Sequence, residues 1–157
     1  MSPAPTRSVA PASRAKGLPT SSRSRSKPRS ACGLDVFGTD YPTSDGTCIR
    51  DYIHVSDLVA AHRDALAYLR AGDASTTLNC GYGRGFSVLE VIDTIKRVSG
   101  IDFKVGFTDR RPGDTAEVVA ACDRIRSTLK WRPRFNDLET IVSHALAWER
   151  KLSQRTG

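Results

Sequence analysis

The chain has 157 residues, and its 24 Lys and Arg against 17 Asp and Glu give a formal net charge of +7. The whole excess lies in residues 1–30, which hold seven basic residues and no acidic one, so residues 31–157 carry 17 of each sign and are neutral. The sequence pI of about 9.6 therefore reflects one end of the chain and does not indicate a nucleic-acid interface on a folded domain.

Residues 1–33 form a basic tail rich in Ser, Arg and Pro. Its first thirty residues hold eight Ser and five Pro but only two large aliphatic residues, Val9 and Leu18. This is too little apolar surface to offset the entropy of ordering the chain, and we expect a disordered tail. Because the composition changes abruptly between about Ser30 and Leu34, we hypothesise that the tail is an out-of-frame reading of GC-rich coding DNA.

Residues 34–152 hold nearly all the large hydrophobic residues and predict one globular domain, with a short tail over 153–157. No apolar run approaches the length of about 18 residues that a membrane-spanning helix needs, and we expect a soluble, cytoplasmic protein without a membrane partner.

The first folded segment is predicted to form a strand, a loop, a second strand and a helix. Residues 34–37 are a short strand-like run, residues 39–46 are dense in turn formers, and residues 49–55 supply a second extended segment. Ser56 can then cap a helix whose apolar positions follow helical spacing until Gly72 ends it.

A glycine cluster connects the next predicted strand, residues 76–80, to the next helix. Ser87-Val-Leu-Glu90 has the spacing of a capping box for a helix that runs to about Ser99. The cluster itself, residues 81–85, follows a strand and precedes a helix as a dinucleotide-binding loop does. The third glycine of a GxGxxG motif would fall on Phe86, however, so we interpret the cluster as a plain strand-to-helix turn.

The last part of the chain predicts two strands and two helices. In chain order these are a strand over 103–107, a charged loop over 109–114, a strand over 118–122, a helix capped by Asp123 and closed by Pro133, and a helix from 136 to about 152. Six residues of the last helix are predicted to face inward: Leu138, Ile141, Val142, Ala145, Leu146 and Trp148. No repeated βαβ unit with long apolar strands is present, so the pattern indicates a mixed α/β piece without a complete doubly wound sheet.

Two arginine sites point to an anionic ligand. Arg50 lies between a polar loop and an apolar strand, and Arg110-Arg-Pro-Gly-Asp114 places two guanidinium groups and a carboxylate around a rigid turn. Planar guanidinium groups make paired hydrogen bonds to phosphate oxygens. The alternatives are a local ion pair between Arg50 and Asp51 and a solvated charged loop, and both remain open at this point.

Cysteines and histidines do not predict a metal or catalytic centre. The cysteines stand too far apart for CxxC metal-binding pairs and are expected to be reduced thiols: Cys32, Cys48, Cys80 and Cys122. No histidine has a second ligand at metal-binding spacing, and we expect all three to be structural: His54, as a hydrogen-bonded strand residue, His62 and His144. No Ser–His–Asp, HExxH or phosphate-binding P-loop pattern occurs.

The run from Phe37 to Leu58, Phe-Gly-Thr-Asp-Tyr-Pro-Thr-Ser-Asp-Gly-Thr-Cys-Ile-Arg-Asp-Tyr-Ile-His-Val-Ser-Asp-Leu, closely resembles the substrate-domain signature of UDP-glucose 4-epimerases. The similarity continues through residues 78–83, 87–91 and 110–114 to the terminal helix. It covers about residues 34–152, only the C-terminal part of a family member. The resemblance implies an α/β fold, the C-terminal substrate-binding part of an NAD(P)-binding, Rossmann-type extended short-chain dehydrogenase/reductase.

In that family, tightly bound NAD takes a hydride from C4 of the sugar and returns it to the opposite face. By position, Phe37 resembles the residue beside the uracil, with Asp35 on the same strand. Arg50 and Arg111 resemble the diphosphate-binding arginines, and Asp114 the carboxylate that receives a ribose hydroxyl. The resemblance therefore implies six substrate-binding residues, these five and Val118. Val118 falls at the sugar pocket, where some members carry a larger residue or a cysteine.

Two family motifs are absent from this sequence. No Tyr is followed four residues later by Lys, and the N-terminal GxxGxxG cofactor loop is missing. Without an acid/base for the 4-hydroxyl or a hydride acceptor, we expect a truncated, inactive epimerase-like protein that binds no NAD by itself and binds UDP-glucose or UDP-galactose weakly. A complementing N-terminal half on a separate chain is left open.

Two other functions would use the tail. Ser21-Ser-Arg-Ser-Arg-Ser-Lys-Pro-Arg29 could bind nucleic-acid phosphates as an arginine/serine-rich arm, but it has no aromatic residue for base stacking. An organelle transit peptide is the third reading, and the five prolines of the tail oppose the amphipathic helix that such peptides need.

Overall fold

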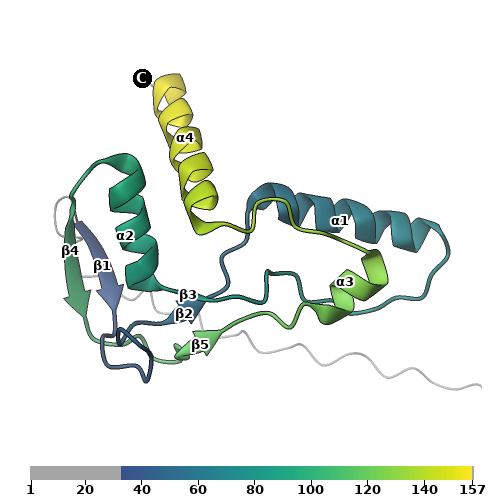
Figure 1. Cartoon of the computed structure of the whole chain (residues 1–157), viewed down its shortest axis with the longest axis horizontal. Coiled ribbons are helices and arrows are strands. Elements are labelled where there is room, and N and C mark those ends of the chain that lie inside the picture. Colours follow the sequence, from purple (N-terminus) through teal and green to yellow (C-terminus); the bar gives the residue numbers. More distant parts are fainter. Residues whose placement is uncertain (1–32, 157) are drawn as a thin grey trace, which may run out of the picture.

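The computed structural model describes residues 33–156. The expected disordered tail, the proposed arm over 21–29 and Cys32 lie outside the described residues. In chain order the elements are β1 (Gly33–Phe37), β2 (Ile49–Arg50), α1 (Val55–Arg70), β3 (Phe86–Ser87), α2 (Val88–Ser99), β4 (Lys104–Thr108), β5 (Glu117–Val118), α3 (Asp123–Leu129) and α4 (Leu138–Thr156) (Figure 1). The mixed α/β class predicted from the sequence is confirmed.

The strands form two small sheets. β1 and β4 pair in parallel, from Gly33 opposite Lys104 to Phe37 opposite Thr108. The second sheet has the order β3-β2-β5, in which β2 runs antiparallel to β3 and parallel to β5. α2 runs directly into β4 through a short connection and lies beside the β1–β4 pair (Figure 1).

α2 begins and ends where its sequence signals predict. Ser87 Oγ accepts a hydrogen bond of 3.0 Å from the Glu90 N–H, and Glu90 Oε2 accepts one of 2.6 Å from the Ser87 N–H, so the predicted capping box is confirmed. At the other end Gly100 adopts a left-handed conformation with φ 71°, which glycine reaches without steric cost.

Two apolar clusters hold the fold together. One joins α1, α3 and the loops around them through five buried residues: Ala61, Tyr82, Cys122, Ile125 and Trp131. The other lies between α2 and the first turns of α4, around Phe86, Leu138 and Val142. The inward face predicted for the last helix is therefore correct at its N-terminal end. Further along, Leu146 is half-buried and packs against the second cluster as predicted, but the prediction is wrong for Ala145, which is exposed, and for Trp148, which is 53% exposed.

The start of α1 differs from the expectation. Its N-cap is His54, whose Nδ1 accepts a hydrogen bond of 3.0 Å from the Ser56 N–H, so the predicted Ser56 cap is wrong. The predicted extended segment reaches regular strand only at Ile49–Arg50. His54 is thus a capping residue, not a strand residue.

Four further predictions are corrected by the structure. Residues 76–80 form no strand, because no strand among residues 33–156 lies alongside to pair with them. The strand predicted over 118–122 is only Glu117–Val118, since β2 offers two residues for pairing. α3 starts at Asp123 without a side-chain cap and ends at Leu129, before Pro133, because Lys130 turns the chain with a left-handed φ of 52°. The last helix continues past Leu152 to Thr156.

Within residues 33–156, none of the helices combines the length and the apolar character that crossing a membrane requires.

Candidate functional site

Four of the six predicted site residues, Asp35, Phe37, Arg111 and Asp114, lie on β1 or on the turn after β4, whereas Arg50 and Val118 pair with each other in the second sheet. Because β1 and β4 are parallel, their carboxyl ends lie at the same edge, with Phe37 opposite Thr108. The turn after β4 places the guanidinium carbon of Arg111 3.5 Å from the centre of the Phe37 ring. The structure therefore brings together two residues that are 74 positions apart in the chain.

Asp114 belongs to the same turn as Arg111. Its N–H donates a hydrogen bond of 3.2 Å to the Arg111 carbonyl, and Gly113 between them has a φ of 88° that favours glycine. Arg111 and Asp114 are both exposed, so their charged groups are open to a ligand.

Arg50 and Val118 lie side by side on neighbouring strands. They are register partners in the parallel β2–β5 pair, and Val118 is 53% exposed. Arg50 is half-buried, and its Nη1 donates a hydrogen bond of 2.8 Å to the Ile49 carbonyl. Asp51 does not form the local ion pair considered above, because its carboxylate accepts hydrogen bonds from backbone N–H groups of the glycine cluster.

Asp35 lies two residues before Phe37, and the alternation of a strand places both on the same face of β1. Its side chain leans across β4, where a Cβ on Gly106 would stand 2.5 Å from the Asp35 Oδ1. The glycine at 106 thus makes room for the carboxylate on the face that carries Phe37.

Sequence reasoning missed two residues beside this turn, Asp40 and Tyr41, and it expected Arg110 to offer its guanidinium to an anion, whereas the structure engages Arg110 with both of them. The Arg110 guanidinium carbon lies 4.0 Å from the centre of the Tyr41 ring, and its Nε is 2.5 Å from Asp40 Oδ1. Tyr41 is buried, and burial raises the pKa of its phenol above the usual 10.0, so it stays protonated at neutral pH. The signal available in the sequence was the pairing of Arg110 with Arg111, but it does not show which aromatic ring each contacts.

The glycine cluster does not fit a dinucleotide. A Cβ on Gly81 would lie 2.5 Å from Asp51 Oδ2, so this glycine allows the loop to pack against the chain itself. The N–H groups of Tyr82 and Gly83, which a pyrophosphate would need, donate to Asp51 at 3.0 Å and 2.9 Å. This supports the interpretation of the cluster as a structural turn, because its N–H groups are not free to bind a pyrophosphate.

Two histidines meet in space although the sequence separates them. His54 Nε2 and His144 Nδ1 are 3.0 Å apart, so the expectation that His144 has no second histidine nearby is wrong. Because His54 Nδ1 already accepts from Ser56, its Nε2 carries the proton and donates to His144. Among residues 33–156, no group of three or more His, Cys, Asp or Glu residues is placed to hold a metal ion.

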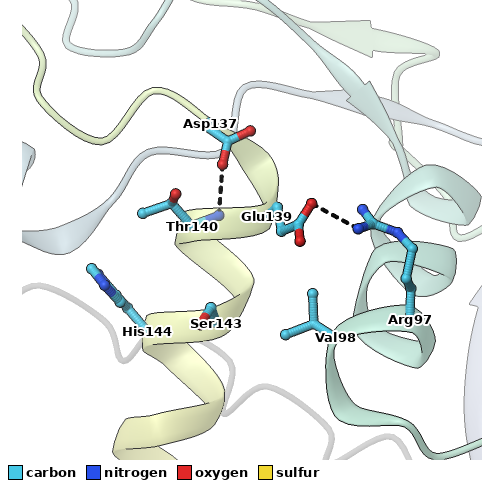
Figure 2. Close-up of a pocket in the computed structure, with 7 residues that line it drawn as sticks. All are labelled: Arg97, Val98, Asp137, Glu139, Thr140, Ser143 and His144. Atoms are coloured by element: carbon cyan, nitrogen blue, oxygen red, sulfur yellow. Dashed lines mark hydrogen bonds and ion pairs between the residues drawn. The ribbon is translucent and has the colours of Figure 1, made fainter.

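A surface cleft of about 540 Å³ lies elsewhere, between α2 and α4 (Figure 2). It is lined by Arg97, Val98, Asp137, Glu139, Thr140, Ser143 and His144. The charged groups of the cleft already have partners within the chain. Arg97 Nη1 lies 2.7 Å from Glu139 Oε2, and the Asp137 carboxylate accepts a hydrogen bond from the Thr140 N–H (Figure 2). We therefore place the candidate site at the β1–β4 loops, where Arg111 has no carboxylate against it among the described ion pairs.

This chain is similar in sequence to known sugar-nucleotide epimerases. The family described as "NAD dependent epimerase/dehydratase family" matches residues 22–81. The UDP-glucose 4-epimerase of Azospirillum brasilense is 57% identical over 124 residues, which are 79% of this chain and 36% of that protein.

Solved structures agree. The UDP-Glc/GlcNAc 4-epimerase of Campylobacter jejuni is 48% identical with a TM-score of 0.69 and covers 77% of this chain. The UDP-glucose-4-epimerase of Stenotrophomonas maltophila, with bound NAD and formylated UDP-arabinopyranose, is 41% identical with a TM-score of 0.74 and covers 78%. This chain spans about 36% of the length of each. Over the matched part, the chain is a homologue of part of the UDP-glucose 4-epimerases, and residues 22–81 match the NAD dependent epimerase/dehydratase family.

Proposed function

We propose that the described part of this chain carries the nucleotide half of a UDP-sugar site. The observation that supports this most is the contact between Arg111 and Phe37, on a turn that also presents Asp114. The similar epimerases of Campylobacter jejuni and Stenotrophomonas maltophila are described with different sugars but share UDP, so the common ligand chemistry is the uridine diphosphate end.

Each group suits one part of that ligand. Phe37 offers an aromatic ring for a flat base, and Asp35 lies on the same strand face. Arg111 and Arg50 supply guanidinium groups for the two phosphates, and Asp114 accepts a hydrogen bond from a ribose hydroxyl. Val118, opposite Arg50 and 53% exposed, borders the sugar in this proposal, and the substrates we expect are UDP-glucose and UDP-galactose.

Catalysis is a separate matter from binding. For the full-length relatives the proposed reaction is the NAD-dependent interconversion of UDP-glucose and UDP-galactose at C4, a step of galactose metabolism. This sequence has no Tyr-x-x-x-Lys to move the proton of the 4-hydroxyl, and its glycine cluster packs against Asp51 where a dinucleotide-binding loop would hold a pyrophosphate. We therefore propose that the chain alone is inactive and that a complementing half would be needed for turnover.

We also propose that the protein acts in a reducing compartment, the cytoplasm, where its cysteines stay thiols.

Calorimetric titration of the 157-residue protein with UDP, UMP and uridine tests the binding proposal. Affinity is expected to rise from uridine to UDP, and Arg111→Ala is expected to weaken UDP binding by about 10- to 100-fold, the effect of losing a charge-assisted hydrogen bond. Arg150→Ala, on the exposed face of α4, is the matched control and should bind as the unmodified protein does. Equal binding of UDP by the Arg111 variant would contradict the site.

The proposal of inactivity has its own test. Incubating the purified protein with UDP-galactose and NAD should form no UDP-glucose above the uncatalysed background. Formation of UDP-glucose that depends on the protein concentration would overturn this part of the proposal.

A further inference from the structure

Two consecutive arginines of the β4–β5 loop stack on two different aromatic rings. Arg111 covers Phe37 at 3.5 Å, and Arg110 covers Tyr41 at 4.0 Å, measured from the guanidinium carbon to the ring centre. Phe37 is the last residue of β1, and Tyr41 belongs to the loop that follows it. The contacts therefore join the end of β1 and its following loop to the loop after β4 through adjacent residues.

The Tyr41 ring is a fixed platform. Tyr41 is 5% exposed, and its N–H donates a hydrogen bond of 3.0 Å to the Gly46 carbonyl. Gly38, which has a φ of 84°, lets the ring come close, because a Cβ there would lie 2.4 Å from Tyr41 Cε2 and 2.8 Å from Arg110 Cγ. A side chain at position 38 would displace both partners of the stack.

Asp40 holds the Arg110 guanidinium in position through two hydrogen bonds. Arg110 Nε lies 2.5 Å from the Asp40 carboxylate, and Arg110 Nη2 donates to the Asp40 backbone carbonyl. An exposed ion pair alone contributes little, but a guanidinium held edge-on by two acceptors and face-on by a ring has few orientations left. Arg110 is thus engaged within the chain, whereas Arg111 has only the Phe37 ring against it among the described contacts.

We propose that Asp40, Tyr41 and Arg110, here called the Arg110 clasp, are positioning residues for the nucleotide site. The inference rests on the proposed function. By anchoring the residue next to Arg111, the clasp holds the Arg111 guanidinium over Phe37 and keeps the Arg111–Asp114 turn facing the ligand. A site that is ordered before binding loses less conformational entropy when the ligand arrives.

Nuclear magnetic resonance of the ligand-free protein tests the positioning directly. The side-chain protons of Arg111 are expected to show an upfield ring-current shift from Phe37, and Arg110→Ala is expected to move them toward free-arginine values. Tyr41→Phe, which keeps the ring, is expected to retain the shift, and Tyr41→Ser to lose it. Unchanged Arg111 signals in a folded Arg110→Ala variant, with the dispersion of the unmodified protein elsewhere, would overturn the clasp.

Binding supplies the second readout. Arg110→Ala is expected to weaken UDP by about tenfold and uridine by less than about twofold, because the clasp acts on the phosphate-binding arginine. Equal weakening of both ligands would indicate a general loss of structure and overturn the inference. If the unmodified protein binds no UDP while the Arg111 signals still respond to Arg110→Ala, the proposed function fails and the positioning role stands.

Discussion

Asp57 is a buried carboxylate that accepts hydrogen bonds from three donors. It is 1% exposed, and its carboxylate accepts hydrogen bonds from the Tyr82 hydroxyl at 2.7 Å and from the N–H groups of Arg134 and Phe135 at 3.0 and 2.9 Å. Its backbone carbonyl accepts from Trp131 Nε1 at 3.1 Å. Burial alone would raise the pKa of Asp57, but these carboxylate hydrogen bonds outweigh it and hold the pKa below the usual 3.8.

Replacing this carboxylate should cost stability in a pH-dependent way. Asp57→Asn is expected to lower the free energy of unfolding at pH 7 by about 2–4 kcal/mol, because an amide NH₂ would face buried donors. The native carboxylate has a depressed pKa, so its stabilisation is complete above the unfolded value of 3.8 and disappears as the pH falls through the lower folded value. Urea unfolding of both proteins from pH 7 to pH 3 measures this. A difference between them that stays constant over that range would contradict the account.

At the scale of elements, the capping of α1 and α2 provides a matched comparison. Ser87 caps α2 through its Oγ and also donates to the Asp45 carboxylate, whereas Ser56 lies exposed in the first turn of α1 and contributes only its N–H to the His54 cap. Ser87→Ala should therefore lower the free energy of unfolding by about 1–2 kcal/mol, and Ser56→Ala by less than about 0.5 kcal/mol. Thermal unfolding of the two variants distinguishes them, and equal losses would mean that the caps are misassigned.

Elements with local signals were predicted well from the sequence. α2 has its cap, its apolar spacing and its terminal glycine within fourteen residues, and the structure follows all three. The strand over 76–80 failed for the opposite reason, since a strand depends on a neighbour and none of the strands in residues 33–156 pairs with this segment. The His54 cap was missed because histidine is rarely the residue that caps a helix.

The candidate site was predictable in part. Its residues and their roles came from the resemblance, and the structure places Phe37 against Arg111 and Arg50 opposite Val118. What sequence could not show is the contact between loops some seventy residues apart, on which the Arg110–Tyr41 stack depends. Those contacts follow from the parallel pairing of β1 with β4, a long-range feature without a local signal.

At the scale of the whole molecule, the sheet of β1 and β4 with α2 lies at one end, and α1 with α3 lies at the other (Figure 1). α1 leaves an apolar stripe uncovered along its length: Val55 at 67%, Val59 at 61%, Leu66 at 48% and Leu69 at 52% exposed. Contiguous exposed apolar surface of this kind promotes association. We therefore expect this protein to self-associate and to be only marginally stable as a monomer.

Charged residues placed on this stripe should reduce self-association without lowering the stability of the fold. The double variant Leu66→Lys with Leu69→Lys is expected to change the free energy of unfolding by less than about 0.5 kcal/mol and to reduce self-association, because both side chains are half exposed. Ile125→Ala, at a residue that is 2% exposed, is the buried counterpart and should cost about 3 kcal/mol. Chemical unfolding with light scattering gives both quantities. A loss in the lysine variant comparable to that of Ile125→Ala would show that the stripe is part of the core.

The central claim, a UDP-binding half-site at the loops after β1 and β4, is tested most directly by following backbone amide signals of the labelled protein during titration with UDP. The account predicts saturable shifts concentrated at residues 35–41, 50 and 109–118, with the cleft between α2 and α4 unaffected. No shifts at ligand excess, or shifts confined to α2 and α4, would contradict it.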